Sequence, residues 1–237
     1  MTGHNFKQAD FFPSRLSQYV KGMRYHSQIS ENGIYIASLG TPLPATVDAI
    51  FNNIDGTGTF TTAGLANGDT YGGGSAGALV QGADSNFGRC IATSNMPNPH
   101  EIVVYGWDYL GQYMAETIGA SATSSAGVKA FKRVEKVVVN TGTLSNADIG
   151  YGGVHGLPFA TKSIIALYFD EAVDSTSAFT DVVRTDPQTL TTGDPRGTFN
   201  PTGTEDGAKE LIVIGVADNY VNAAGNGGLH GIAHVFA

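Results

Sequence analysis

Short apolar segments recur along the chain from residue 33 onward, and stretches rich in Gly, Pro, Asn and Asp separate them. Some segments alternate apolar and polar residues and others are apolar throughout, which is typical of β-strands joined by turns. Because the connections are turn-like and no long helical pattern follows residue 30, we expect an all-β fold, a jelly-roll-like sandwich or barrel. The predicted strands cover residues 33–40, 78–81, 88–94, 101–108, 112–118, 128–139, 163–169, 179–184, 210–217 and 231–237.

The chain divides into three predicted parts. Residues 1–32 form an extended N-terminal arm. Residues 33–77 begin with a short strand and continue as a segment dense in Gly, Thr and Pro, which we expect to be an extended loop supported by a neighbour. Residues 78–237 form the body of the sandwich or barrel, in which the strands on either side of residues 109–111 make a hairpin.

The arm has the pattern of a short amphipathic helix over about residues 14–23, since Phe12, Leu16, Tyr19 and Met23 recur at helical spacing. Aromatic, apolar and basic side chains usually dominate protein interfaces. We therefore expect the arm to bind a partner, although packing on the body of its own chain is an equal alternative. The expected contact residues are Phe6, Phe11, Phe12, Arg15, Leu16, Tyr19, Lys21 and Arg24.

Charge is sparse and unevenly placed. Only 14% of the residues are charged, against ~25% in average soluble domains, which suggests that other subunits cover part of the surface. The net charge is −8, and residues 1–30, with four cationic side chains against one Asp, leave −11 on the rest of the chain. An acidic protein surface is the expected partner of the arm; nucleic acid is the less favoured alternative, because the acidic body would be repelled by phosphates.

Cys90 is the only cysteine, so no internal disulfide can form, and its strand context favours a buried, inert thiol. The N-terminal residues lack the apolar core of a signal peptide, and no apolar run is long enough for a membrane helix. We expect assembly in a reducing cytoplasm and no membrane partner.

A Gly-Gly-apolar-His-Gly-apolar pattern occurs twice, at residues 152–157 and 227–232. Glycine serves where the backbone has positive φ or passes close to another chain segment, so the repeat is interpreted as one backbone device used twice. The alternative is a metal site of His155, His230 and His234, but no Glu or Cys stands at a suitable spacing. In a strand, moreover, His230 and His234 would be about 13 Å apart. We expect no metal ion.

Other chemical patterns are weak. Ser94, His100 and Asp108 could be arranged as a triad, but no nucleophile-elbow motif surrounds the serine. The glycine-rich residues 72–77 lack the Lys of a phosphate loop. Carboxylate pairs such as Glu205 and Asp206 are interpreted as solvated turn residues. The sequence therefore predicts a protein that is not an enzyme and uses no cofactor.

Residues 82–160 contain an ordered set of turn and strand motifs. The set begins with a Gly-Arg strand at residues 88–89 and a V-x-G-x-D-x-x-G turn at residues 104–111. It continues with a Glu-Thr-Ile strand at residues 116–118, a G-x-K-A-F-x-x-V strand at residues 127–134 and a Gly-Leu-Pro turn at residues 156–158. The set resembles a group of tailed-bacteriophage virion proteins, and the likeness continues more loosely through residues 194–199 and the second Gly-Gly-Leu-His-Gly.

The resemblance implies a capsid decoration or cement protein, a β domain that stabilises the phage head through protein–protein contacts. It implies a virion location on the capsid surface, the major capsid protein as partner, and a homo-oligomer, trimer or dimer. A neck or tail structural protein remains an alternative. A glycan-binding module of a head or tail fibre is another, with Trp107, Tyr105, Tyr109 and Tyr113 as a stacking platform. Trp107 and Tyr105 share a strand face with Val103, however, which favours a role in the core.

Overall fold

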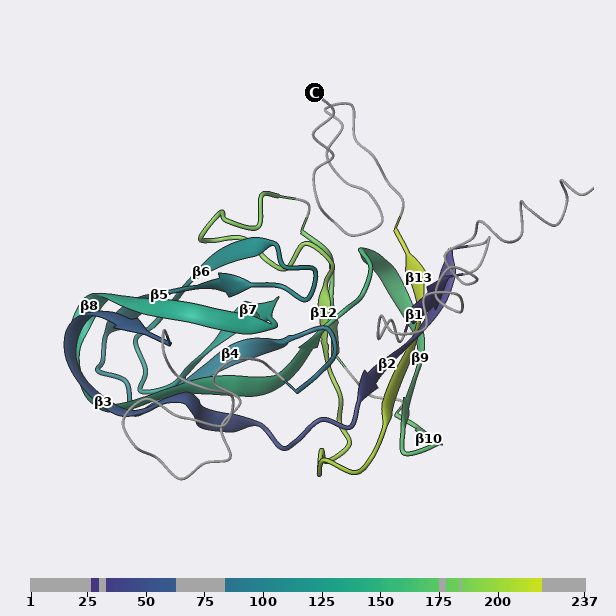
Figure 1. Ribbon diagram of the computed structural model, residues 1–237, viewed down its shortest axis with the longest axis horizontal. Coiled ribbons are helices and arrows are strands. Elements are labelled where there is room, and N and C mark those ends of the chain that lie inside the picture. Colours follow the sequence, from purple (N-terminus) through teal and green to yellow (C-terminus); the bar gives the residue numbers. More distant parts are fainter. Residues whose placement is uncertain (1–26, 30–32, 63–83, 175–177, 184, 219–237) are drawn as a thin grey trace, which may run out of the picture.

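Two β-sheets make up the described part of the chain, which comprises residues 27–29, 33–62, 84–174, 178–183 and 185–218 of a computed structural model (Figure 1). Every regular element within these ranges is a strand, so the all-β prediction is confirmed. The described residues contain no helix that is long and apolar enough to cross a membrane. The predicted arm helix and the predicted strands over 78–81 and 231–237 lie outside the described residues.

The strands have the following bounds: β1 (Ser27–Ile29), β2 (Ile34–Gly40), β3 (Thr46–Thr61), β4 (Arg89–Ser94), β5 (His100–Trp107), β6 (Tyr113–Ala120), β7 (Ser125–Phe131), β8 (Arg133–Gly156), β9 (Thr161–Phe169), β10 (Ala172–Val173), β11 (Ala178–Thr180), β12 (Thr198–Asn200) and β13 (Leu211–Ala217). The predicted hairpin is present as β5 and β6, which pair in register from His100–Ala120 to Trp107–Tyr113.

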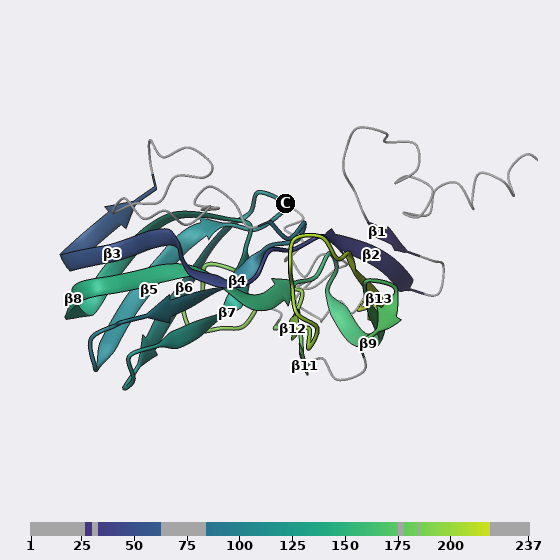
Figure 2. The same cartoon turned by 90° about the horizontal axis from the view of Figure 1, so that it is seen from below.

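The eight-stranded sheet folds over on itself because its two longest strands, β3 and β8, bend together (Figures 1 and 2). The first part of β8, up to Thr141, pairs with β5. The last part, from Asp148 to His155, pairs with β4, which in turn pairs with β7. Since β3 follows β8 through both parts, the sheet forms two layers joined at one curled side, a half-barrel.

Residues with positive φ lie where the two strands bend. They are Asn53, Gly56 and Gly58 in β3, with φ of 49°, 98° and 111°, and Gly142 and Asn146 in β8, with φ of 90° and 51°. The register between β3 and β8 shifts repeatedly over the same stretch. Such bulges let a strand curve and increase its twist.

The loop predicted over residues 41–77 was therefore wrong for residues 46–61, which form β3. Its Gly, Asn and Asp residues bend a strand that the partner β8 supports, whereas the sequence rules assign them to turns that end a strand. The strand predicted over 128–139 was also wrong in extent, because the chain turns at Lys132 between β7 and β8. There the backbone N–H of Lys132 donates to the carbonyl of Trp107 at 2.8 Å.

The space between the two layers of the half-barrel holds the larger apolar core. Each layer contributes inward-facing side chains, which are buried almost completely. They include Ile102 and Val104 of β5, Met114 and Ile118 of β6, Ile91 of β4, Phe131 of β7, and Ile149 and Tyr151 of β8. Burying a large aliphatic or aromatic side chain contributes about 1.5–3 kcal/mol, so this core is a major source of stability.

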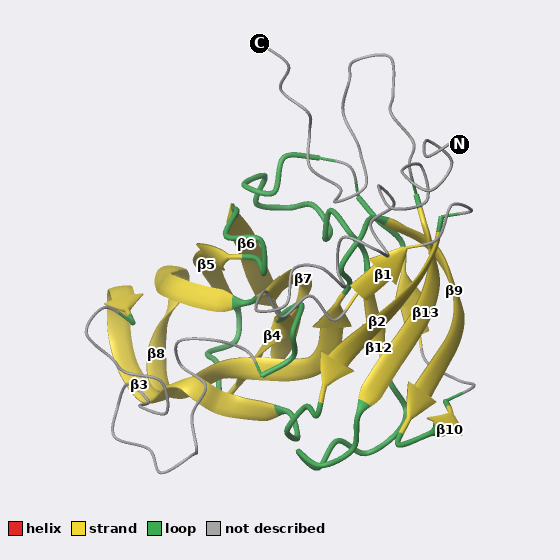
Figure 3. Ribbon diagram, turned by 45° about the vertical axis from the view of Figure 1, so that its right-hand side comes forward, coloured by secondary structure: helices red, strands yellow, loops and turns green. Residues whose placement is uncertain are grey.

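The five-stranded sheet, in the order β1-β2-β13-β9-β10, stands at one end of the half-barrel (Figures 1 and 3). Its inner face packs on Phe87, Leu157 and Phe199, which lie around the end of β8. The prediction that residues 163–169 form a buried strand was only partly right. Leu167 is buried, whereas Ile165 is 55% exposed, because only one face of the sheet is covered.

Two buried charged side chains close the half-barrel on the side of β6 and β7. The Lys129 ammonium donates to the carbonyls of Ala115, Pro187 and Thr189 at 2.7–2.8 Å. The Glu116 carboxylate accepts the backbone N–H groups of Val128 and Lys129 at 2.5 and 3.2 Å. Side chains thus supply, between β6 and β7, the hydrogen bonds that a backbone ladder would supply in a closed barrel.

The first Gly-Gly-Val-His-Gly stretch forms the end of β8, and none of its glycines has positive φ. At Gly156 the reason for glycine is close approach: a Cβ there would lie 2.6 Å from both the Ala130 Cβ and the Phe87 carbonyl oxygen. At Gly153 the nearest atom would be 3.5 Å away. The second stretch, residues 227–231, lies outside the described residues.

Replacing Gly156→Ala should lower the free energy of unfolding by about 1–3 kcal/mol, since the extra methyl group overpacks the contact with Ala130 and Phe87. Gly153→Ala, in the same motif, should change it by about 0.5 kcal/mol or less. Urea denaturation followed by the fluorescence of Trp107 measures both. Equal effects of the two substitutions would contradict the close-approach explanation.

Candidate functional site

The chain contains a buried histidine–glutamate pair. The His155 side chain is 0% exposed, and its Nε2–H donates to Oε1 of Glu205, which is also buried. The interpretation of Glu205 as a solvated turn residue was therefore wrong. The contact spans fifty positions of sequence, and no local spacing indicates it.

Arg89 lies beside this pair and forms the centre of a buried polar cluster. Its guanidinium donates to Oε2 of Glu205 at 2.6 Å and to Oδ1 of Asp84 at 3.1 Å. It also donates to the backbone carbonyls of Gly152 at 2.6 Å and Leu43 at 2.7 Å. Arg89 is 1% exposed, so a charge that would be costly to bury alone is compensated on several sides.

The position of His155 keeps its imidazole neutral. Burial lowers its pKa, an effect that Arg89 reinforces and that the hydrogen bond to Glu205 only partly offsets. A proton on Nδ1 would be buried without an acceptor, because that atom has no hydrogen-bond partner. The pair therefore joins segments of the fold and cannot exchange protons with a substrate in solvent. Within the described ranges no group of three His, Cys, Asp or Glu residues could hold a metal ion.

A second buried cluster surrounds Arg196. Its guanidinium donates to Oδ2 of Asp108 at 2.6 Å and lies 5.0 Å from the ring centre of Tyr109. Oδ2 of Asp194, also buried, accepts the N–H of Ala130 at 2.9 Å. Burial outweighs these contacts and raises the pKa of Asp194. The cluster ties the loop before β12 to the β5–β6 turn and to β7.

The structure does not bring together the triad considered from the sequence. Asp108 binds Arg196, Ser94 donates to Asp148 at 3.0 Å, and the ring nitrogens of His100 contact Pro97 O and Ser125 Oγ. Cys90 is buried, as predicted, and burial raises the pKa of its thiol.

The aromatic residues of the β5–β6 hairpin lie on its outer face. Tyr105 and Tyr113 stack with ring centres 6.4 Å apart, and Trp107 meets Tyr113 edge-on at 5.5 Å. These three rings are half-buried, so the expected core role of Trp107 and Tyr105 was wrong. The core side chains of β5 are Ile102 and Val104, on the opposite face.

Cationic side chains already lie on two of these rings. The Arg133 guanidinium is 4.8 Å from the Trp107 ring centre, and the Lys136 ammonium is 4.8 Å from that of Tyr105. Tyr109 belongs elsewhere, since its ring packs on Phe87. In the row of Tyr105, Trp107 and Tyr113, two of the three rings thus have a cation over one face.

The outer face of the five-stranded sheet is different, because it is apolar and uncharged over its centre. One row across the strands runs from Ile36 through Ile214 to Ala166. The row on one side consists of Ile34, Val216 and Ser163, and the row on the other of Ser38, Ile212 and Tyr168. We call these nine positions, together with Ile165, the outer face. Ile36 is 51% exposed, and β-branched side chains are seldom left so on a flat sheet.

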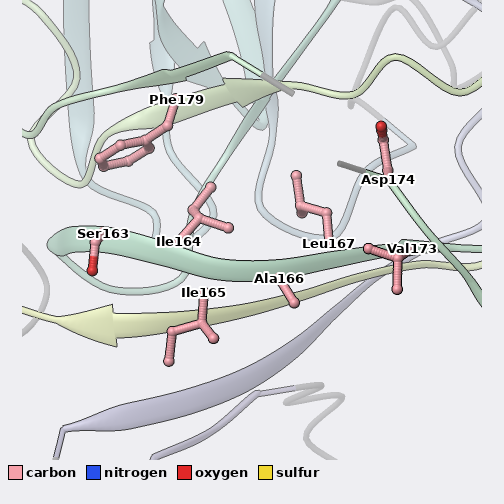
Figure 4. Close-up of a pocket in the computed structure, with 8 residues that line it drawn as sticks. All are labelled: Ser163, Ile164, Ile165, Ala166, Leu167, Val173, Asp174 and Phe179. Atoms are coloured by element: carbon pink, nitrogen blue, oxygen red, sulfur yellow. The ribbon is translucent and has the colours of Figure 1, made fainter. Parts of the chain in front are cut away.

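Figure 4 shows the residues that line a hollow of ≈460 Å³ along β9, with side chains pointing to both sides of the strand. Ser163, Ile165 and Ala166 point to the outer face, as does Val173 of β10, whereas Ile164, Leu167 and Phe179 point into the hollow. Ile165 is itself the extra residue of β9 at a register shift, because its neighbours Ile164 and Ala166 pair with the consecutive residues Gly215 and Ile214 of β13. Both sides of β9 thus present apolar side chains.

The predicted arm contacts, Phe6, Phe11, Phe12, Arg15, Leu16, Tyr19, Lys21 and Arg24, lie outside the described residues. What the structure does place is β1, a strand within the C-terminal part of the predicted arm (1–32). β1 is the edge strand of the five-stranded sheet and pairs with β2, the strand that carries Ile34 and Ile36. No sequence pattern indicated that the arm leads into the edge of an apolar sheet face.

Comparison with known proteins reveals no relative: no protein family, no curated protein and no solved structure matches the chain. Its function is therefore inferred from its own surfaces and buried contacts.

The neutral state of His155 predicts a loss of stability in acid. The pKa of His155 is lowered in the folded chain, whereas an unfolded histidine titrates at about 6.5. Below that pH the unfolded chain takes up a proton more readily than the folded chain, so the contribution of His155 to stability is full above about pH 6.5 and falls as the pH drops below it, by at most about 1.4 kcal/mol at about pH 5.5.

Urea titrations between about pH 7.5 and about pH 5 measure this loss. His155→Gln, whose amide can still donate to Glu205, should remove that part of the pH dependence. His100→Gln, which replaces another buried histidine, should retain it. An unchanged slope in His155→Gln would show that His155 does not carry the effect.

Proposed function

We propose that the chain is a structural protein of a tailed-bacteriophage virion, a capsid decoration protein that attaches to the major capsid protein and stabilises the head. It acts through protein–protein contacts, as a homo-oligomer on the capsid surface. The motifs over residues 82–160 suggest this class of protein. The outer face of the five-stranded sheet supports an adhesive role.

The outer face carries the proposal because of its chemistry. Its exposed side chains are mostly Ile, with Ser and Tyr at the border rows, where the Ser38 hydroxyl donates to the Glu210 carboxylate at 2.5 Å. Covering one large aliphatic side chain that is half-exposed gains roughly 1 kcal/mol. The face and the arm that leads into its edge could therefore supply several modest contacts, which add up when many copies bind a repetitive shell.

The buried charged clusters agree with this role. The buried histidine, arginines and carboxylates bind one another inside the chain, around Arg89 and Arg196. They join loops and strands that are distant in sequence. Such contacts suit a rigid body whose task is to resist deformation.

A glycan-binding module remains a second candidate, favoured by the half-buried aromatic row on β5 and β6. It predicts that the purified protein binds sugars on an immobilised glycan panel and that Trp107→Ala abolishes this binding. The decoration role predicts no bound glycan and unchanged capsid attachment in Trp107→Ala.

Attachment to the shell can be measured by sedimenting the protein with empty heads assembled without it. We expect Ile36→Asp and Ile165→Asp each to weaken binding at least about tenfold, since a carboxylate would be desolvated in the contact. Val128→Asp is the matched control, because Val128 is 47% exposed but lies on β7 in the other sheet.

Circular dichroism would show that all three variants fold. The proposal fails if the two outer-face variants bind heads as tightly as Val128→Asp and the unaltered chain do.

A further inference from the structure

We infer that two copies of the chain pair through β9, antiparallel and about a two-fold axis at Ile164, so that their five-stranded sheets join edge to edge. The inference rests on the proposed function in one respect, because it supplies the contact through which the proposed homo-oligomer forms. The partner at this edge is a second copy of the same chain.

The edge of β9 is open along most of its length. β9 is the last long strand of the five-stranded sheet, and β13 follows it on one side from end to end (Figure 3). On the other side β10 pairs only with Phe169 and Tyr168, and the N–H of Asp174 donates to the Leu167 carbonyl at 2.8 Å. Among the described residues, no second strand pairs with residues 162–166. An unpaired edge of this kind presents backbone groups to another strand.

The alternation of hydrogen bonds across the sheet shows which backbone groups point to this edge. The N–H of Ala217 in β13 donates at 2.7 Å to the carbonyl of Gly33, beside the start of β2. Alternate residues of a strand bond to the same side, so the backbone groups of Gly215 also point to β2. Ile164, which lies opposite Gly215, therefore directs its N–H and C=O away from β13, toward the open edge.

The hollow of ≈460 Å³ lies beside the same edge, since residues whose side chains point to both sides of β9 line it. Ile164 and Phe179 point into it (Figure 4). On the other side of the strand, Ile165 and Val173 are 55% and 61% exposed. A strand that pairs with this edge would cover apolar side chains on both sides, which adds hydrophobic burial to its backbone hydrogen bonds.

The limits of the open stretch favour a second β9 as the partner. Asp174 occupies the edge at Leu167, and the N–H of Thr161 donates to the Arg196 carbonyl at 3.1 Å. The open stretch between these two contacts is centred on Ile164. Two identical antiparallel strands are symmetric about their central residue, so a two-fold axis at Ile164 pairs each open stretch with its copy over its full length.

Charge is complementary in this arrangement. Lys162 is exposed at the beginning of the open stretch, and Asp170 and Glu171 are exposed just beyond the other end of β9. Asp174 lies near that end as well. Antiparallel pairing about Ile164 brings the cationic end of each strand toward the acidic end of its partner, which favours this orientation over a parallel one.

The chain covers another strand edge with its own residues. The N–H groups of Ala115 and Thr117 in β6 donate to the carbonyls of Pro187 and Leu190 at 3.2 and 2.8 Å. A loop thus protects the edge of β6, as is usual in natural β proteins. Over residues 162–166 no described loop does the same for β9, so this edge is left for a partner.

The pairing would also extend the surface that is proposed to contact the shell. When two sheets join edge to edge, their outer faces continue into one another. The dimer would present one apolar face of twice the width, and its contacts with a repetitive shell would add up.

Cross-linking at the axis tests the inference directly. In Ile164→Cys the two thiols of a dimer would sit on residues whose Cα atoms are about 5.5 Å apart, which suits a disulfide. Oxidised glutathione should therefore link most chains into dimers on a non-reducing gel, while Cys90 is buried and does not interfere. The control is Val128→Cys, exposed on β7 of the other sheet.

The control should give at least about tenfold less dimer, because its thiols meet only by collision. Equal cross-linking of the two variants, or none in Ile164→Cys, would overturn the inference.

Sedimentation equilibrium measures the dimer without a cross-link. The unaltered chain, of 24.7 kDa, should sediment with twice this mass. Ile164→Pro removes the N–H offered to the partner, at an edge position where proline is tolerated. It should raise the dissociation constant at least about tenfold, with circular dichroism showing that it folds. Ile36→Asp, on the outer face of β2, should leave the dimer unchanged. Dissociation by Ile36→Asp would place the interface on the outer face instead and refute pairing through β9.

Binding to empty heads separates this inference from the proposed function. The cross-linked Ile164→Cys dimer should bind heads as tightly as the unaltered chain does. If the dimer forms but binds no heads, the inference stands and the decoration role fails. If the chain binds heads but is monomeric in solution, and Ile164→Cys cross-links to the capsid protein, a capsid strand occupies the edge. In that case the decoration role stands and the inference fails.

Discussion

The guanidinium of Arg89 is the contact on which the arrangement of the two sheets depends. It joins β4, the end of β8, the segment between β2 and β3, and the loop before β13 through hydrogen bonds to Gly152, Leu43, Asp84 and Glu205. Each partner belongs to a different stretch of the chain. Removing one member of such a buried charged set typically costs about 3–5 kcal/mol, because the others are left uncompensated. The cluster thus specifies how the half-barrel meets the five-stranded sheet, and His155 extends it.

This fixed junction determines which surfaces remain available. The half-barrel covers the inner face of the five-stranded sheet, where Phe87, Leu157 and Phe199 form the second core. The outer face is left apolar and uncovered by the described residues, at the end of the molecule where β1 begins. A rigid body, a sheet face that favours contact, and an arm that enters at the edge of that face are consistent with one another. They are the features on which the proposed adhesive role rests.

Local patterns predicted the strands that have a β-type run of residues of their own, whether or not their partners are close in sequence. The β5–β6 hairpin follows from two alternating segments and a Gly-containing turn, and β2, β4, β9 and β13 follow from short β-rich runs. Long-range contacts decided the rest. Gly56 and Gly58 lie within a bent strand, β3, because β8 pairs with it along this stretch. Glu205 is buried because it accepts hydrogen bonds from Arg89 and His155, which are distant in sequence. Alternation placed Trp107 with Val103 correctly but could not tell which face of β5 the second layer covers. The outer face itself was not foreseen, because a strand with one exposed apolar side resembles a strand buried on both.

The central claim is that the five-stranded sheet turns its outer face toward a shell. The most direct measurement is an electron cryo-microscopy reconstruction of heads that carry the protein. The account predicts that β2, β13 and β9 lie against capsid density, with the β5–β6 aromatic row directed to solvent. A bound orientation in which Ile36 and Ile165 face solvent and the half-barrel meets the shell would contradict it.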